Sequence, residues 1–151
     1  MNKKMITFTS VYALIMAALL VLTFLYDWNP SGYSFEGDGS TVSIKQGVTG
    51  EEVGQADLAE DTSGILLFQA AIQDVKAHWQ QDLIVISLLF PLILFSLFKE
   101  AQPFKEILPH KWFVTMTIAI IVIYAVATLP SYIGEIQSVH DRAEVLLNDG
   151  T

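Results

Sequence analysis

Three long runs without a charged side chain dominate this sequence: residues 5–26, 83–98 and 112–133. A helix rises 1.5 Å per residue, so crossing a hydrocarbon core of about 30 Å takes about 20 residues. The first and third runs have 22 residues each, and the second has 16. The second can still span if its polar neighbours lie at the headgroup level and Lys99 snorkels. We therefore predict three transmembrane helices.

The first run has an alternative interpretation as a cleaved signal peptide, because Lys3 and Lys4 precede it. Its apolar stretch is long for that role, and no small-residue cleavage site follows it before Trp28. We therefore favour an uncleaved signal anchor over residues 1–26.

The basic residues predict the orientation of the chain, because short cytoplasmic connections are enriched in lysine and arginine. Residues 27–82 and 134–151 hold 14 of the 16 acidic residues but only three basic ones. A re-entrant segment 83–98 would invert this pattern, so we favour a multi-pass protein of the cell membrane with a cytoplasmic N-terminus, a cytoplasmic loop 99–111 and an extracytoplasmic C-terminus. The five basic residues assigned to the cytoplasm are Lys3, Lys4, Lys99, Lys105 and Lys111.

Residues 27–62 are polar and rich in turn-forming residues, which predicts an extracytoplasmic acidic loop. Within it, Tyr33 and Phe35 alternate with polar residues, and so do Val42 and Ile44. This alternation predicts a short β-hairpin. The acidic, glycine-containing stretch 47–61 is predicted to be a mobile loop.

The second and third spans are each predicted to continue outside the membrane as an amphipathic helix. Each span and its extension form one long helix, over 63–98 and over 112–151. Their apolar residues recur with alternating spacings of three and four. The fold class is therefore an all-α membrane protein with three transmembrane helices, a small extracytoplasmic helical stalk and a short β-hairpin. The apolar stripes of the two stalk helices either pack against each other, which their similar lengths favour, or form a partner-binding surface. The residues assigned to that surface are Ile65, Phe68, Ile72, Val75, Trp79, Ile136, His140 and Leu147.

The three spans contain hydroxyl groups but no ionisable side chain other than tyrosine. Ion and proton pathways usually need acidic, basic or histidine residues inside the membrane, so the sequence argues against a pump. No cysteine is present, and no glycine-rich phosphate loop or nucleophile elbow occurs. The net charge of −8 argues against nucleic acid as a partner. We expect a protein that is not an enzyme and has no cofactor.

His78 and Asp82, together with His140 and Asp141 on the other stalk helix, are candidates for a metal site, because imidazole and carboxylate together bind Zn²⁺ or Mn²⁺. The spacing matches no established metal motif, so we favour ordinary interfacial histidines and assign no metal ligand. A calcium loop beginning at Glu36 fails because Gly47 occupies the position that needs a bidentate glutamate. Pro91 is either a hinge or, as we favour, a static kink.

The favoured function is therefore a non-enzymatic accessory, regulatory or immunity-type subunit that uses its extracytoplasmic face. Its expected partners are the lipid bilayer and a membrane or extracytoplasmic protein, with a homo-oligomer as a further option. The alternative is an extracytoplasmic module that senses or binds a cation or a peptide, and a metalloenzyme is the third hypothesis. The acidic residues assigned to the alternative are Glu51, Glu52, Asp57, Glu60 and Asp61.

Overall fold

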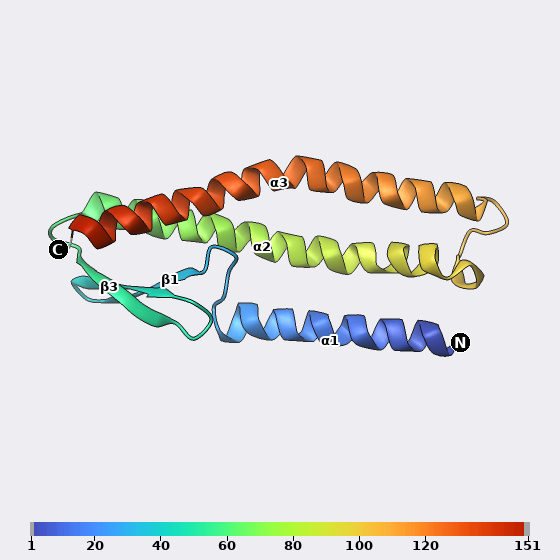
Figure 1. Cartoon of the computed structure of the whole chain (residues 1–151), viewed down its shortest axis with the longest axis horizontal. Coiled ribbons are helices and arrows are strands. Elements are labelled where there is room, and N and C mark those ends of the chain that lie inside the picture. Colours follow the sequence, from blue (N-terminus) through green and yellow to red (C-terminus); the bar gives the residue numbers. More distant parts are fainter. Residues whose placement is uncertain (1, 150–151) are drawn as a thin grey trace. The chain divides into compact units, whose positions relative to one another are not determined.

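The computed structural model describes residues 2–149, which form three long helices and one small antiparallel sheet (Figure 1). All three helices are long and apolar enough to cross a membrane, which supports a multi-pass membrane protein. The elements, in chain order, are α1 (Lys3–Leu25), β1 (Tyr33–Asp38), β2 (Thr41–Gln46), β3 (Glu51–Asp57), α2 (Thr62–Leu97), the short 3-10 helix Lys99–Ala101, and α3 (His110–Asp149).

Local residues explain where the helices begin and end. α1 stops before Asp27, whose left-handed φ of 51° turns the chain away from the helix axis. α2 starts beside Asp61, whose carboxylate oxygen Oδ1 accepts a hydrogen bond from the amide of Gly64 at 2.8 Å. Once started, α2 passes through Pro91 and α3 passes through Pro130 without a break. Each amphipathic segment is therefore continuous with a candidate membrane span, as predicted.

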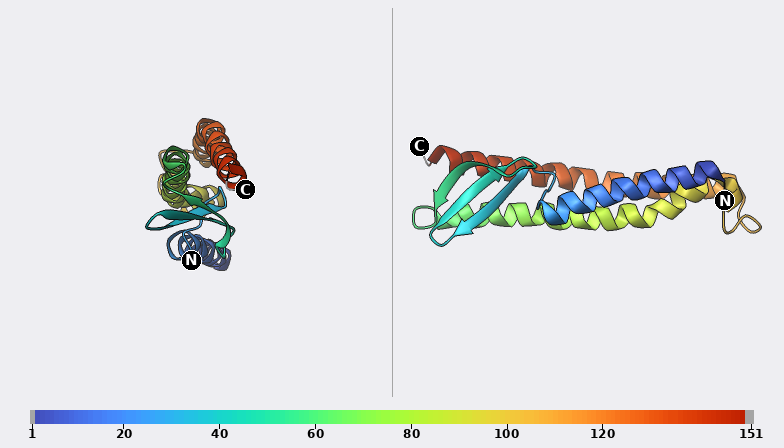
Figure 2. Two further views of the ribbon diagram at one scale, coloured as in Figure 1. Left: turned by 90° about the vertical axis from the view of Figure 1, so that its left-hand side faces the viewer. Right: turned by 90° about the horizontal axis from the view of Figure 1, so that it is seen from below.

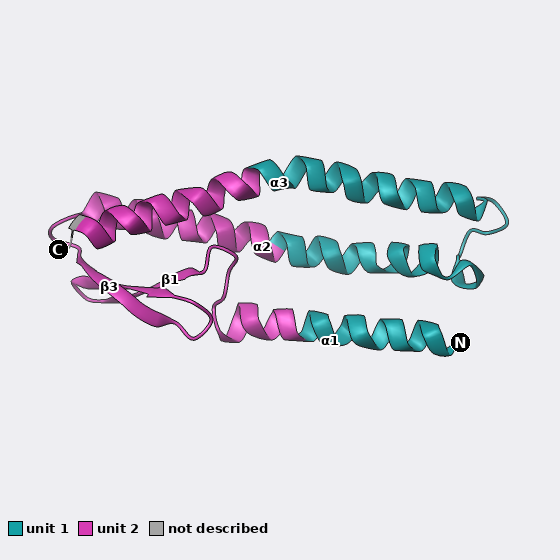
Figure 3. Ribbon diagram, in the orientation of Figure 1, with its two compact units in different colours: residues 1–17, 81–130 teal, residues 18–80, 131–151 magenta. Residues whose placement is uncertain are grey.

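The chain divides into two compact units, and the division falls within each long helix (Figure 3). Residues 1–17 and 81–130 form what we call the all-helical unit. Residues 18–80 and 131–151 form the sheet-bearing unit, which contains all three strands.

The prediction of a mobile loop over 47–61 was wrong. The hairpin β1–β2 is present, but Glu51–Asp57 pairs with β2 as a third antiparallel strand. The positions of β3 opposite the buried Ile44 and Val42 hold only Gly54 and Ala56. Because these inward positions lack large apolar side chains, the strand shows no alternation that the sequence could reveal.

Close packing explains why β3 needs a glycine. A Cβ atom placed on Gly54 would collide with the side chain of Leu147 in the last turns of α3. The register also shifts between Ile44 and Lys45, so that Val53 is the extra residue of a β-bulge. Small residues and a bulge together let β3 lie against α3.

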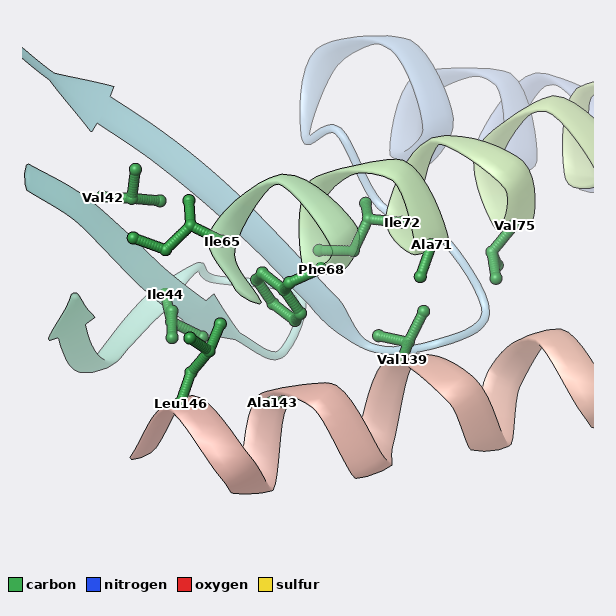
Figure 4. Close-up of a cluster of buried hydrophobic side chains, with 10 residues drawn as sticks. All are labelled: Val42, Ile44, Ile65, Phe68, Ala71, Ile72, Val75, Val139, Ala143 and Leu146. Carbon is green, nitrogen blue, oxygen red and sulfur yellow. The ribbon is translucent and has the colours of Figure 1, made fainter. Parts of the chain in front are cut away.

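The hydrophobic core lies in the sheet-bearing unit, where β2 packs against α2 and α3 (Figures 2 and 4). The predicted stripe of α2 supplies most of it, and the predicted stripe of α3 was partly right, since Ala143 is buried in the core and Leu147 packs against it. Val139 is buried in the core, whereas His140 is exposed. A seven-residue repeat drifts by about 20° per heptad from the face of a straight helix, so a spacing of three and four does not by itself fix which of two neighbouring residues is buried. The core residues are Val42, Ile44, Ile65, Phe68, Ala71, Ile72, Val75, Val139, Ala143 and Leu146.

Candidate interaction site on the sheet-bearing unit

Four of the residues assigned to partner binding lie inside the core. Ile65, Phe68, Ile72 and Val75 are each 0% exposed. They hold α2 against the sheet and α3 (Figure 4). Burying a side chain of this size contributes about 1.5–3 kcal/mol. The stripe therefore serves the fold, and these four side chains are not accessible at the surface in this conformation.

The other four assigned residues lie at the margins of the core. The Trp79 indole donates a hydrogen bond to the Thr23 hydroxyl at 2.8 Å, and its ring meets Trp28 edge to face. His140 lies against the Tyr33 ring, with 5.2 Å between ring centroids, and Ile136 and Leu147 are half-buried. These contacts join α1, α2, α3 and the sheet within this unit.

An open groove runs between α2 and α3 and consists of two adjoining hollows of about 210 Å³ and 270 Å³. We call it the α2–α3 groove. Leu67 and Arg142 line both hollows, and the side chains of Leu67 and Val145 are 48% and 55% exposed. Small residues on both helices leave its floor accessible. The lining residues are Gly64, Leu67, Ala70, Ala71, Asp74, Glu135, Ser138, Asp141, Arg142, Val145 and Leu146.

The charges that line this groove are mainly negative. Asp74, Glu135 and Asp141 contribute three carboxylates against the single guanidinium of Arg142. The Arg142 Nε donates to the Ser138 hydroxyl at 3.2 Å, which orients the guanidinium along α3. An apolar centre with an acidic margin is complementary to an apolar surface flanked by basic groups.

A histidine–glutamate pair links α2 to α3 at one end of the groove. His78 Nδ1 lies 2.9 Å from Glu135 Oε2, and the His78 ring packs edge to face on Tyr132 at 4.8 Å. The side chains of His78 and Glu135 are only 18% and 31% exposed. The contact fixes the position of Glu135, one of the groove carboxylates.

An ion pair also ties the segment after α1 to α2. Lys76 Nζ lies 2.5 Å from Asp27 Oδ2 and 6.0 Å from the centre of the Phe35 ring. Lys76 thus contacts the β1 strand as well as the α1–β1 connection, so both are held in place beside α2.

A second surface feature is an acidic depression of about 670 Å³ beside β3 and the start of α2. Asp57, Glu60 and Asp61 line it together with Thr41 and Gln55. Two of the carboxylates also accept hydrogen bonds from backbone amides, Asp57 from that of Ala59 and Asp61 from that of Gly64. The depression thus gathers three of the five acidic residues that the sequence singled out.

The metal hypothesis finds no support in residues 2–149, where no three histidine, aspartate or glutamate side chains are grouped to hold an ion. His78 contacts Glu135, whereas His140 Nδ1 lies 2.9 Å from the Ile136 carbonyl of its own helix. In the all-helical unit, Asp82 accepts a hydrogen bond from the Tyr124 hydroxyl. The three residues are therefore engaged in separate contacts.

Comparison with family models, with curated proteins and with solved structures returned no match. The sequence carried one overlooked signal for the groove: Leu67 and Val145 are apolar but lie outside the predicted stripes. Exposed apolar residues that gather at one groove, unlike those scattered singly, are typical of surfaces that contact other proteins.

Proposed function

We propose that this protein is a non-enzymatic accessory or regulatory membrane subunit that binds a partner protein through the α2–α3 groove. The observation that carries the proposal is the exposed apolar pair Leu67 and Val145 at an open groove of the sheet-bearing unit. Exposed apolar surface rimmed by polar groups is typical of protein interaction sites. An immunity-type role belongs to the same class.

In this proposal the N-terminus is cytoplasmic and the sheet-bearing unit is extracytoplasmic. The support is the distribution of charge, since Lys3, Lys4, Lys99, Lys105 and Lys111 all flank the ends assigned to the cytoplasm. Leu67 precedes the charge-free run 83–98 by 16 residues, or about 24 Å along a helix at 1.5 Å per residue. Lipid that covers the run would not cover Leu67.

The partner that fits the groove is an amphipathic helix with basic residues beside its apolar stripe. Small side chains such as Gly64 and Ala70 let a helix approach closely, and the carboxylates of Asp74, Glu135 and Asp141 complement basic groups. A helix of a neighbouring membrane protein that projects from the same side meets both requirements.

A photo-crosslinking amino acid at Leu67 tests this proposal in native membranes. We expect one discrete adduct, and we expect it to be lost when Val145→Glu is added, because a carboxylate would then enter the apolar centre. The same probe at Gln73, an exposed position of α2 outside the groove, is the matched control and should give no adduct.

The mass of the adduct distinguishes the occupants. A species heavier by one partner chain that carries a basic amphipathic helix supports the proposal, whereas twice the mass of this chain indicates a homo-oligomer. Equal crosslinking from Leu67 and Gln73, or recovery of a lone monomer from native membranes, would contradict a groove-specific partner.

The acidic depression favours a second candidate function, the binding of a basic peptide. Asp57, Glu60 and Asp61 present carboxylates around one open hollow, and an oligolysine peptide is the probe. We expect Glu60→Gln to weaken binding, while Glu144→Gln, on an exposed site of α3, should not. Equal binding by both variants would show that the peptide responds only to the overall negative charge of the protein. A melting temperature unchanged by millimolar Ca²⁺ or Mg²⁺ would rule out the alternative that the depression binds a cation.

A further inference from the structure

The connection between α2 and α3 is an ordered structure in the all-helical unit. Gln102 is only 3% exposed, and its side-chain amide donates to the Leu108 carbonyl at 2.9 Å. The amide oxygen Oε1 of Gln102 lies 2.9 Å from His110 Nδ1, at the start of α3. One buried side chain thereby fixes both the loop and the first turn of the next helix.

This ordered loop holds large apolar side chains outward. Phe104 is 58% exposed, Ile107 is 85% exposed, and Trp112 in the first turn of α3 is 63% exposed. A loop with such groups is unfavourable in water but suits the boundary between headgroups and acyl chains, where aromatic residues are enriched.

Beside the loop lies an apolar hollow of about 370 Å³. Leu92 of α2, Phe104 and Ile107 of the loop, and Met116 of α3 are among its lining residues. Its single polar side chain, Thr117, is already satisfied, because its hydroxyl donates to the Phe113 carbonyl at 3.0 Å and accepts from Ser96 at 3.1 Å. The hollow therefore offers a hydrocarbon surface without an open hydrogen-bonding group.

Two lysines and one carboxylate, that of Glu106, lie within two positions in the chain of residues that line this hollow, so the net charge beside it is positive. Lys105 is the chain neighbour of Phe104, and Lys111 lies two residues before Phe113, which also lines the hollow. Both lysines are exposed, and neither has an ion-pair partner among residues 2–149. Ammonium groups at this level attract anionic lipid headgroups.

We infer that the hollow and its two lysines form a binding site for an anionic phospholipid. One acyl chain occupies the hollow, and the phosphate lies near Lys105 and Lys111. The inference is independent of the proposed partner and concerns the other unit, so either can fail without the other.

Native mass spectrometry of the full chain in detergent tests the site, with phosphatidylglycerol and phosphatidylcholine as paired probes. We expect preferential retention of phosphatidylglycerol. Lys105→Gln together with Lys111→Gln should reduce the preference by at least about fivefold, the effect expected of one lysine near a charged headgroup.

Occupying the hollow tests the acyl-chain contact. Met116→Trp should lower retention of both lipids, because the indole fills the space. Ile123→Trp is the matched control, since Ile123 is an exposed α3 residue outside the hollow, and it should leave retention unchanged.

Three results would overturn the inference. The first is equal retention of both lipids by the unsubstituted chain, which indicates an unselective lipid annulus. The second is displacement of phosphatidylglycerol by millimolar glycerol phosphate, which indicates a site for soluble phosphate. The third is equal effects of Met116→Trp and Ile123→Trp, which would mean that the hollow holds no lipid.

Discussion

The two units use the same kinds of residue in opposite ways. In the sheet-bearing unit, ten apolar residues from β2, α2 and α3 form one buried cluster. In the all-helical unit, and in residues 18–25 of α1, the apolar side chains mostly face outward. Exposed examples are Leu88 at 69%, Ile118 at 55%, Ile123 at 69% and Val126 at 69%. The first arrangement is that of a water-soluble domain, and the second needs lipid around it.

The helices of the all-helical unit contact one another through rings and hydroxyl groups. The Tyr12 hydroxyl donates to the Ile86 carbonyl at 3.0 Å, and its ring stacks on Phe90 at 3.8 Å. Lipid tails are as apolar as leucine, so such specific contacts replace the hydrophobic effect between helices. Substitutions should therefore have different consequences in the two units.

The largest expected effect is that of Phe68→Ala. Phe68 is fully buried, and its truncation leaves a cavity that should destabilise the sheet-bearing unit by about 3–5 kcal/mol. Amide hydrogen exchange of β2 in lipid nanodiscs measures this loss. Ile123→Ala in the all-helical unit should change stability by no more than about 0.5 kcal/mol, because its side chain faces outward. Similar losses from both variants would remove the contrast between the units.

Gly54→Val should have the next largest effect, about 1–3 kcal/mol, because the new side chain overpacks the space held by Leu147. Gly37→Ala is the control, since no atom lies within 4 Å of a Cβ built there. Leu147→Ala should partly rescue Gly54→Val, and exchange rates of the β3 amides report the coupling. Strictly additive effects would show that the two residues do not meet.

Thr23→Val should cost about 1 kcal/mol, the net contribution of one hydrogen bond. It removes the acceptor of the Trp79 indole while keeping the side-chain shape. The emission of Trp79 should change, and the free energy of unfolding should fall slightly. Thr115→Val, whose hydroxyl donates only to the Lys111 carbonyl of its own helix, is the control. Equal responses would contradict a role for the Trp79 contact.

The smallest expected effect is the pH dependence of Glu36. The hydrogen bond from Lys45 and then its positive charge lower the Glu36 pKa below the usual value. The ion pair therefore stabilises the folded state above the ordinary glutamate pKa, and this contribution is lost as pH falls through the lowered pKa. Glu36→Gln should abolish that part of the acid response, and salt should weaken it in the parent chain. A Glu36 titration at the ordinary pKa, followed by NMR, would contradict the pairing.

The sequence predicted the three long helices and the hairpin because their signals are local and strong. Charge-free runs and the alternation of Val42 and Ile44 depend on neighbours in the chain. It did not predict β3, because Gly54 and Ala56 are too small to give an alternating apolar pattern, and the glycine is explained only by the packing of Leu147 against Gly54. The phase of the α3 stripe and the groove beside Leu67 likewise depend on how two distant helices meet.

The central claim, taken with the orientation proposed above, is that the sheet and the parts of α2 and α3 packed on it fold in water outside the cell, whereas the charge-free runs lie in lipid. The chain has no cysteine, so single cysteines can be introduced at Gln55, Glu106 and Ile123. In intact cells, a membrane-impermeant maleimide should label Gln55→Cys at once and Glu106→Cys only after the membrane is opened, and it should leave Ile123→Cys unlabelled. Labelling of Glu106→Cys but not Gln55→Cys in intact cells, or rapid labelling of Ile123→Cys, would contradict the claim.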